Sequence, residues 1–371
     1  MSLGLPDLPD LLSTGAAAPG SVPRVKLEKR APGGGAPGGL GGLGSDLLAA
    51  AASAAGALGV AQPDPLTDAL TSLQVELLAA PSLATCRLQF LPRADFPALA
   101  PGDPITVKLS DGAAPVPVFA GTVARISGSR GALEVLLVSA ASKLARIRRN
   151  AGYESQGFGD LLKTWAGEAA LTPGHITSGP DYAFLAVDDR LSLWDWVARL
   201  ALHADVPAWT DAAGALHATK PAGQPVATFK FGQTLLALDA HARDPVITGA
   251  HIVGEGSAGR QGSDAWSWLA KDPQGVSASG GTGGALGQEG GLRDLASVAA
   301  AAAGAVAGQG RIADLVEVRV PGTPALDIAA VFKLEGCPQG VGDGQWSALE
   351  VRHRFDARSG FVTEVVGAKF P

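Results

Sequence analysis

Apolar and polar residues alternate through much of the chain, beginning near residue 70. Each alternating segment presents one apolar and one polar face, which is typical of a half-buried β-strand. The first predicted strands are residues 73–77, 86–90, 105–109, 116–126 and 133–138. Asp111 and Gly112 follow the third strand and predict a tight hairpin, because glycine accepts the positive φ that the turn requires. Short antiparallel strands at this spacing favour a sandwich or a small barrel.

Two helical patterns interrupt the strands. Apolar residues at helical spacing predict helices over residues 158–169 and 193–200, and Ser192 is a good N-cap for the second. Neighbouring strands are predicted at residues 182–187, 206–210 and 215–219. The last two are separated by a glycine-containing turn at residues 211–214. These elements predict a small α/β subdomain.

A second β region occupies the remainder of the chain. Its predicted strands are residues 227–231, 246–253, 316–320, 349–355 and 361–366. A Gly/Ser-rich segment at residues 254–291 interrupts them, and its length is unusual for a connection inside a compact domain. An Ala-rich stretch at residues 292–306 predicts a helix between this segment and the closing strands.

These patterns predict a mainly β fold with α+β insertions. Residues 1–65 are rich in Gly, Pro and Ala around four basic residues (Arg24, Lys26, Lys29 and Arg30), so they cannot bury enough apolar surface to fold alone. We expect a flexible arm there unless a partner orders it. The other predicted parts are a first β-barrel at residues 66–150, the α/β subdomain at residues 151–222, and a second β-barrel at residues 223–371 that carries the insertion and helix (254–310).

The charge of the chain argues against a protein that mainly neutralises nucleic-acid phosphates. The 371 residues include 29 basic and 35 acidic side chains, which gives a net charge of −6. The clearest basic cluster is Lys143, Arg146, Arg148 and Arg149, which we interpret as a surface or subunit contact. The chain begins MSLGLPDLPDLL, without the features of a signal peptide, and residues 47–61 are too short to span a bilayer. We therefore expect no export signal and no membrane insertion.

Several short motifs suggest chemistry but lack its context. Cys86 and Cys337 have no paired spacing, so packed thiols in a reducing compartment are expected rather than a disulfide or a metal site. Gly254, Gly256 and Gly259 match the GxGxxG dinucleotide pattern, yet no apolar helical stripe follows them. A flexible loop is the favoured interpretation of this segment.

No residue is predicted to be catalytic, to bind a cofactor or to bind a metal. The six histidines show no metal-binding spacing and are expected to be isolated; they are His175, His203, His217, His241, His251 and His353. Neither GxSxG nor a phosphate-binding loop occurs. A dispersed triad or carboxylate pair stays open, because such groups meet only on folding.

The order of elements resembles the late control protein D family of phage tail hubs. Residues 152–174 (GYESQGFGDLLKTWAGEAALTPG) and 191–221 (LSLWDWVARLALHADVPAWTDAAGALHATKP) follow that family's sequence of helix, strand, helix and hairpin. The C-terminal strands are similar too, with a "V.H.F....GF.T" ending. That ending is carried by Val351, His353, Phe355, Gly360, Phe361 and Thr363. The likeness extends from about residue 66 to the C-terminus.

The resemblance implies the structural hub of a contractile tail or injection-system baseplate. Two tube-like β-barrels per chain would let a homotrimer present a pseudo-sixfold ring that joins a hexameric inner tube to a trimeric spike. The implied partners are the inner tube protein, a separate spike or tip protein, other baseplate proteins, and a cargo or tape-measure protein. No cofactor is implied. The particle would be made in the bacterial cytoplasm, and the family offers no role for the N-terminal arm or the Gly-rich insertion.

Two other functions remain open at this point. A particle-borne hydrolase, for example one that degrades the cell wall, would use dispersed carboxylates such as Glu154, Asp160 or Glu168. A glycan-binding β module would instead expose tryptophan side chains as stacking surfaces. The tryptophans considered for that role are Trp194, Trp209, Trp266 and Trp268. Trp196 belongs with the apolar face of its helix, whereas Trp194 flanks that face, and an exposed Trp194 would mark an interface.

Overall fold

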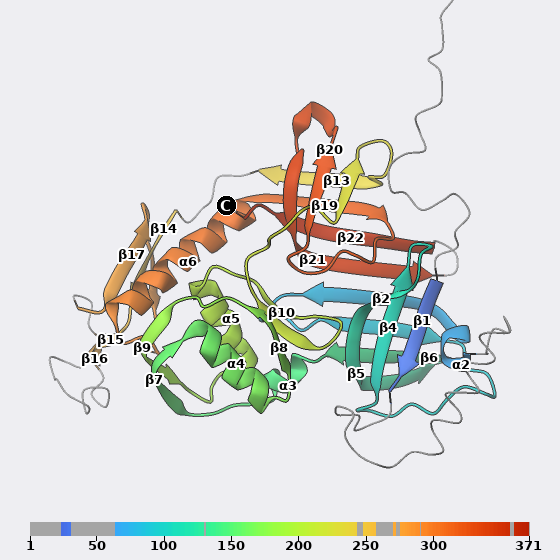
Figure 1. The fold of residues 1–371 in the computed structure, drawn as a ribbon, viewed down its shortest axis with the longest axis horizontal. Helices are drawn as coiled ribbons and strands as arrows, with labels where there is room; N and C mark the ends of the chain where they lie inside the picture. The colour runs from blue at the N-terminus through green and yellow to red at the C-terminus, as the bar shows by residue number, and fades with distance from the viewer. Residues whose placement is uncertain are drawn as a thin grey trace, which may run out of the picture.

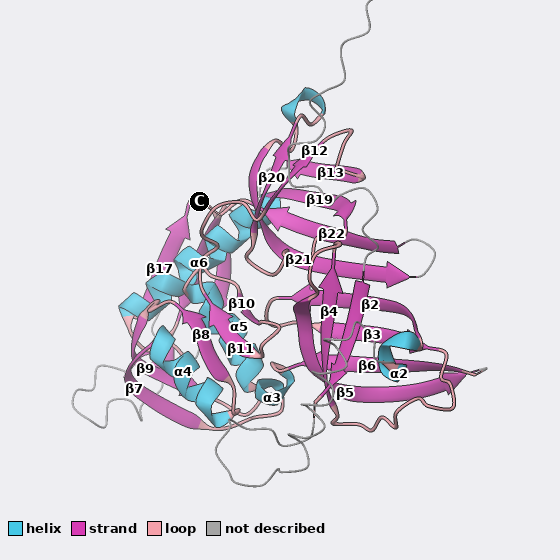
Figure 2. Ribbon diagram, turned by 45° about the vertical axis from the view of Figure 1, so that its right-hand side comes forward, coloured by secondary structure: helices cyan, strands magenta, loops and turns pink. Residues whose placement is uncertain are grey.

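The structure is a computed structural model in which a large β-sheet lies beside a smaller α/β region (Figure 1). It describes residues 24–30, 64–129, 131–242, 248–256, 270–271, 275–289, 291–356 and 360–370. Figure 2 shows the sheet on one side of the molecule and most of the helices on the other. The predicted mainly β class, with α+β insertions, is confirmed.

The first set of strands follows a short helix, α2 (Pro65–Asp68). Its strands are β1 (Arg24–Lys29), β2 (Leu70–Leu78), β3 (Thr85–Phe90), β4 (Pro104–Ser110), β5 (Val116–Ser129) and β6 (Ala132–Ser139). They lie side by side in the order β1-β4-β5-β6-β3-β2. Gly112 lies in the connection between β4 and β5 and has a φ of 119°. A residue with a side chain rarely adopts such a value, and the sequence predicted a positive φ for this glycine.

The second set repeats this arrangement. Its strands are β12 (Ala227–Lys230), β13 (Ala237–Ala242), β19 (Asp314–Pro321), β20 (Val331–Glu335), β21 (Gly344–Asp356) and β22 (Gly360–Ala368), with the 3-10 turn η2 (Pro338–Gly340) before β21. Their spatial order is β12-β20-β21-β22-β19-β13, so strands one to six of each set occupy the same places. One difference is that β1 runs antiparallel to β4, whereas β12 runs parallel to β20.

The two sets are joined into one twelve-stranded sheet. Strand β2 of the first set pairs antiparallel with the C-terminal part of β21 from the second set, from Ser72 opposite Asp356 to Leu78 opposite Glu350. A single hydrophobic core extends under both sets, from Leu27 and Leu73 to Val316 and Phe332. The two sets are therefore joined by the β2–β21 ladder, and the hydrophobic core is continuous beneath it.

The α/β subdomain lies between the two sets in sequence. It contains α3 (Ser142–Ala145), β7 (Ala151–Gly157), α4 (Phe158–Glu168), β8 (Thr172–Ile176), β9 (Asp181–Val187), α5 (Leu193–His203), β10 (Ala208–Thr210) and β11 (Ala215–Ala218). Ser192 caps α5 as predicted, because its side chain accepts from the Asp195 N–H while Asp195 accepts from the Ser192 N–H. The predicted subdomain elements are present, with boundaries shifted by one to three residues.

The insertion between β13 and β19 forms a small three-stranded sheet, a separate two-stranded ladder of β15 with β16, and a helix. It comprises β14 (Gly249–Val253), β15 (Glu255–Gly256), β16 (Ala270–Lys271), β17 (Ser277–Gly281), β18 (Ala285–Gln288) and the long helix α6 (Leu295–Ala313). Strand β14 lies between β17 and β18 in a three-stranded sheet, and β14 and β17 pack against α6. Ile252, Val276 and Val298 join the core of the α/β subdomain. The described part of this Gly-rich segment is therefore a packed element of the subdomain.

Three sequence expectations need correction. The strand predicted at residues 246–253 for the second β region is β14, which pairs with β17 and β18 in the small sheet of the insertion rather than with the strands of the large sheet. The arm at residues 1–65 contains an ordered strand, because β1 pairs with β4 and its Leu27 is buried in the main core. The Ala-rich helix begins at Leu295 rather than at residue 292, since Asp294 caps it, and it continues through Gly310 to Ala313. The remainder of the arm, residues 1–23 and 31–63, lies outside the described residues.

Candidate assembly surface

The outer edges of the twelve-stranded sheet present backbone groups with no partner in the described part of the chain. Strand β13 is the last strand at one end of the sheet, and among the described strands it pairs only with β19. In the described residues, the strand partners of β5 are β4, over residues 116–122, and β6, over residues 121–129. The outward edge of β5 beyond residue 123 is therefore uncovered by any described strand. Uncovered edges are places where another chain can add a strand.

A network of charges lies on the polar side of the ladder that joins the two sets. Arg352 contacts Glu76 on the neighbouring strand (Nε to Oε1, 3.1 Å), Glu350 on its own strand (3.0 Å) and Glu364 on β22 (3.5 Å). Burial lowers the pKa of Arg352, but the surrounding carboxylates outweigh it, and the net effect is a raised pKa. Three strands from both sets are thus held together by one guanidinium group.

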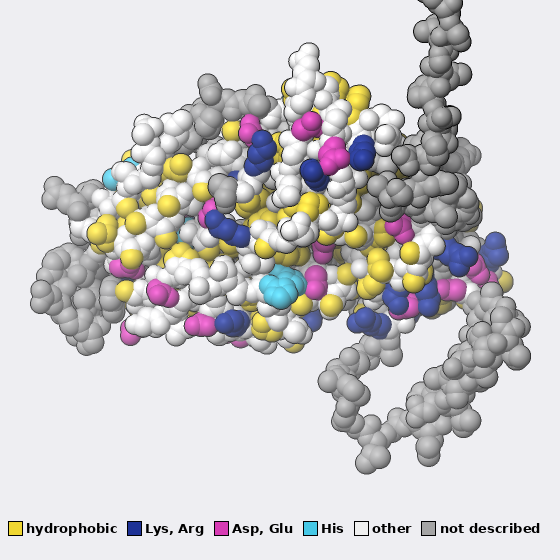
Figure 3. Space-filling view, turned by 45° about the horizontal axis from the view of Figure 1, so that its top comes forward, with side chains coloured by type: hydrophobic (Ala, Val, Ile, Leu, Met, Phe, Trp, Pro, Cys, Tyr) yellow, Lys and Arg dark blue, Asp and Glu magenta, His cyan; other side chains and the backbone are white. Residues whose placement is uncertain are grey.

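A groove of about 320 Å³ runs along this polar side toward the β13 edge. Charged side chains line it from β13, β19, β21 and β22; they are Asp239, Glu317, Arg319, Glu350, Arg352 and Glu364. On the face that Figure 3 shows, acidic and basic side chains lie intermixed. Neighbouring charges of opposite sign partly cancel at a distance, so such a surface suits specific contacts more than broad attraction of a polyanion.

His353 is a buried histidine at the junction of β21, β22 and the loop before β20. Its Nε2 lies 3.2 Å from the Leu326 carbonyl oxygen, so this nitrogen carries the proton and donates. Its Nδ1 lies 3.0 Å from Thr363 Oγ1, which therefore donates to it, and Thr363 Oγ1 in turn accepts from the Thr323 N–H. Burial lowers the pKa of His353 to about 4, so the ring is neutral at pH 7.

A second group of ionisable residues lies where the α/β subdomain meets the sheet. His217 stacks on Trp209 and its Nε2 lies 3.0 Å from Asp211, while His175 packs beside it with 5.6 Å between ring centroids. Asp327, from the loop before β20, has a pKa raised to about 6, chiefly by burial and to a smaller extent by the nearby Asp211. The expectation of isolated histidines is wrong for this pair, which the order of the strands brings together.

The predicted basic cluster is tied down by contacts within the chain. Arg149 forms an ion pair with Glu168, which raises the pKa of the guanidinium, and the Lys143 side chain donates to the Ala170 carbonyl oxygen. Arg148 donates to the Arg190 carbonyl oxygen at 2.6 Å. These contacts fix the subdomain and leave its charged side chains partly exposed; whether another chain contacts them stays a prediction.

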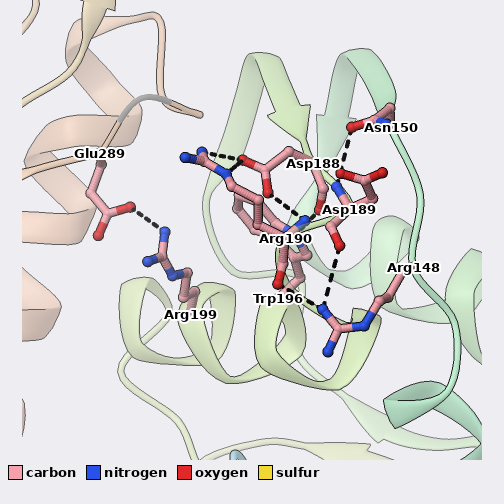
Figure 4. Close-up of polar contacts among 8 residues, drawn as sticks. All are labelled: Arg148, Asn150, Asp188, Asp189, Arg190, Trp196, Arg199 and Glu289. Atoms are coloured by element: carbon pink, nitrogen blue, oxygen red, sulfur yellow. Dashed lines mark hydrogen bonds and ion pairs between the residues drawn. The ribbon is translucent and has the colours of Figure 1, made fainter.

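The Arg148 contacts belong to a polar turn between β9 and α5 (Figure 4). Asp188 forms an ion pair with Arg190, which lowers the pKa of the Asp188 carboxyl, and Asn150 accepts from the Asp189 N–H. On the next helix Arg199 pairs with Glu289 of the insertion at 3.1 Å. The close-up shows the Asp188–Arg190 and Arg199–Glu289 pairs together with the Arg148 contact to the backbone of the turn, and these contacts hold the turn and α5 in place.

The carboxylates considered for hydrolysis do not converge on one site. Asp160 faces solvent beside Lys163, Glu168 pairs with Arg149, and Glu154 is exposed on β7. Glycoside hydrolysis usually needs two carboxyl groups on either side of the scissile bond, and these three side chains do not form such a pair. Within the described residues no three His, Cys, Asp or Glu side chains lie together as metal ligands would.

The aromatic and cysteine predictions have mixed outcomes. Trp194 and Trp209 are buried, and Trp194 Nε1 donates to the Ser82 carbonyl oxygen, so neither is an exposed stacking surface. Trp266 and Trp268 lie outside the described residues. The prediction of packed thiols is confirmed, because both cysteines are free and buried and burial raises the pKa of each.

The GxGxxG segment is described only in part. Gly254 sits against the Leu292 carbonyl oxygen and the Val276 and Val298 side chains, where a Cβ atom would be 2.4 to 2.9 Å from its neighbours. A side chain at position 254 would therefore collide with these neighbours, which explains the glycine by packing. Residues 257–259 of the motif lie outside the described residues.

Among the described helices none is long and apolar enough to cross a membrane.

Comparisons with known proteins place this fold among tail proteins. No protein-family model matches the sequence, and no curated protein matches it. The 43 kDa tail protein of prophage MuSo2 from Shewanella oneidensis is similar over 80% of this chain and 93% of its own, with 12% identity and a TM-score of 0.61. A tail protein from Neisseria meningitidis MC58 is similar over 81% and 92%, with 14% identity and a TM-score of 0.61.

A third structure links the fold to secretion machinery. The E. coli c3393 protein is described as a component of the type VI secretion system with structural similarity to the T4 bacteriophage tail proteins gp27 and gp5. It is similar over 82% of this chain and 74% of its own, with 12% identity and a TM-score of 0.52. The resemblance to tail hubs that the sequence suggested is thereby confirmed for the fold.

Proposed function

We propose that the chain is the structural hub of a contractile tail or related injection-system baseplate, where a homotrimer joins a hexameric inner tube to a trimeric spike. The observation that carries the proposal is the repeated six-strand order within one continuous sheet. Three chains with two similar sets each offer six similar surfaces. A sixfold tube needs six such surfaces on one side, while the three whole chains match a threefold spike on the other.

The fold of the tail proteins compared above supports the proposal, as does the character of the surface. The charged network at the ladder and the uncovered strand edges are features of an assembly surface, and no three His, Cys, Asp or Glu side chains lie together as metal ligands among the described residues. We therefore propose a non-enzymatic role. The proposed location is a phage tail or tail-like particle assembled in the bacterial cytoplasm.

The proposed partners follow from this geometry. They are further copies of the chain, the inner tube protein, a separate spike or tip protein, other baseplate proteins, and a cargo or tape-measure protein. The proposed units are the β-barrels at residues 66–150 and 223–371 and the α/β subdomain at residues 151–222, with β1 from the N-terminal segment added to the first barrel. Neither specific nucleic-acid binding nor membrane insertion by this chain is part of the proposal.

Electron microscopy of particles from a strain that carries an epitope-tagged chain tests the function. The tag is expected at the spike end of the tube, and deletion of the gene is expected to abolish tubes attached to spikes. Purified protein is expected to show no turnover on peptidoglycan. Normal particles without the chain, or hydrolysis by the pure protein, would contradict the proposal.

A further inference from the structure

The contact between the two strand sets inside one chain can be repeated between chains. In that contact strand two of the first set (β2) pairs with the second half of strand five of the second set (β21). The corresponding strands at the outer ends are β13, which is strand two of the second set, and β5, which is strand five of the first. Both have an uncovered edge in the described part of the chain.

We propose that β13 of one copy pairs antiparallel with the second half of β5 of the next copy, in the register of the β2–β21 ladder. The inference rests on the proposed hub function for the number of copies, since three chains linked in this way would close a ring of six strand sets. The contact is heterologous, because it joins two different edges, and such contacts form rings when the rotation closes.

The register follows from rows of residues that run across both sets. In the first set Val123, Leu137, Cys86 and Val75 stand opposite one another across β5, β6, β3 and β2. In the second set Ala348, Gly367, Val316 and Ala240 form the corresponding row across β21, β22, β19 and β13. The correspondence is supported by a register shift at the same place in both sets, between Val123 and Arg125 and between Ala348 and Glu350.

The residue pairs of the β2–β21 ladder then predict the residue pairs of the β13–β5 ladder between two copies. Val75 stands opposite His353, five residues beyond Ala348. Its counterpart Ala240 should therefore stand opposite Gly128, five residues beyond Val123. On the polar face, the Glu76–Arg352 pair becomes His241 opposite Ser127. The described ends of the two strands allow this pairing from residues 239 to 242 and from 129 to 126.

Apolar side chains at the uncovered edges are less buried than their counterparts beneath the β2–β21 ladder. Val75 is 0% exposed beneath the ladder, whereas its counterpart Ala240 is only partly buried against the same core. Val351 is 0% exposed, whereas Ile126, at the corresponding position of β5, is only partly buried. A strand added at each edge would cover these apolar side chains, and the area so removed from water favours the pairing.

Disulfide trapping in the full-length chain tests the register. Cysteines that replace directly opposed residues of paired strands have Cα atoms close enough to form a disulfide. The variant with His241→Cys and Ser127→Cys is expected to convert on mild oxidation into covalently linked dimers and trimers. The matched control combines His241→Cys with Gly128→Cys, which lies one residue out of register and on the opposite face. A Cβ atom on Gly128 would lie 3.9 Å from the Ala132 carbonyl oxygen, which is an ordinary contact, so the control is expected to fold and to remain unlinked.

The outcomes separate this contact from the hub function. A trimer that reaches the particle but gives no link between residues 241 and 127 would overturn the strand pairing and leave the hub function standing. Linking of His241→Cys to itself would also overturn it, because that result means a symmetric pairing of two β13 strands. Linked chains that never occur in a tail-like particle would support the pairing and contradict the hub function.

Discussion

At the scale of single residues, Arg352 is the side chain that most directly joins the two strand sets. Its guanidinium contacts carboxylates from three strands, and its side chain is 30% exposed. Arg352→Ala would leave three acidic groups close together without their cation. We expect a loss of about 1–2 kcal/mol of unfolding free energy, more than a surface ion pair usually contributes.

A neighbouring arginine provides the control for that measurement. Among the described residues Arg354 forms an ion pair only with Glu364, and its side chain is 47% exposed, so Arg354→Ala should cost at most about 0.5 kcal/mol. Denaturant unfolding of both variants at the same pH compares the two losses. Equal losses would show that the network around Arg352 adds nothing to the junction.

His353 predicts a dependence of stability on pH. Burial holds its pKa at about 4 in the folded chain, below the ordinary value of about 6.5. The unfolded chain therefore binds more protons between these values, so stability is complete above pH 6.5 and falls as the pH drops toward 4. The expected contribution to the slope is up to about 1.4 kcal/mol per pH unit.

The variant His353→Gln isolates this effect, because glutamine keeps a donor and an acceptor but does not titrate in this range. His203 has a similarly lowered pKa of about 4, and Asp327, with a raised pKa of about 6, acts in the opposite direction. The comparison therefore uses the difference between wild type and variant in unfolding free energy at pH 7 and pH 5. An unchanged pH dependence in His353→Gln would refute the assignment.

At the scale of elements, helix α6 depends on glycine where it crosses α5. A Cβ atom on Gly304 would lie 1.9 Å from the Leu202 carbonyl oxygen. We expect Gly304→Ala to lower the unfolding free energy by about 1–3 kcal/mol through overpacking. Gly310 lies on the same helix with nothing within 4 Å of an added Cβ, so Gly310→Ala should be neutral or slightly stabilising. Thermal unfolding compares the two, and equal melting temperatures would contradict this packing.

Strand β1 makes a second prediction at this scale. Leu27 is 3% exposed in the main core, and the Leu27 N–H donates to Thr67 Oγ1 at 2.9 Å. Leu27→Asp would place a charge in that core and should release β1 from β4. The expected result is faster hydrogen exchange in β1 and β4. Lys26→Asp, at a neighbouring position outside the core, serves as the control, and equal exchange in both variants would contradict the role of Leu27.

The contrast between predicted and observed elements has physical causes. Alternation such as that at residues 86–90 reports a strand with one buried face, so most strands of both sets could be predicted. Strand β1 was missed because one buried leucine among charged residues gives little periodic signal. The packed insertion was missed because small residues such as Gly280 and Ala302 fit by close approach, and close approach leaves no hydrophobic pattern.

At the scale of the whole molecule, the repeated strand order could not be predicted from the sequence. The two sets share a topology and a pattern of buried positions, but their residues differ, as Cys86 and Val316 illustrate at corresponding places. Strand pairing between distant segments depends on contacts that local patterns do not specify. The junction at β2 and β21 joins residues more than 270 positions apart, and it appears only in the folded chain.

The duplicated sheet fits the proposed assembly function, which would act through surfaces rather than through a single site. Side chains that titrate unusually, such as His353 and Asp327, lie within junctions of the fold. The outward features are strand edges and mixed charges, which act through geometry and pairing. Assembly into a closed ring is the function that we propose for this arrangement.

The mass of the native assembly, measured by native mass spectrometry on the purified full-length chain, tests the central claim most directly. Two equivalent strand sets per chain predict a closed trimer, with three times the 37.2 kDa of one chain. A strictly monomeric chain at the concentrations reached during assembly would contradict the account, and so would a dimer that closes by symmetric contacts.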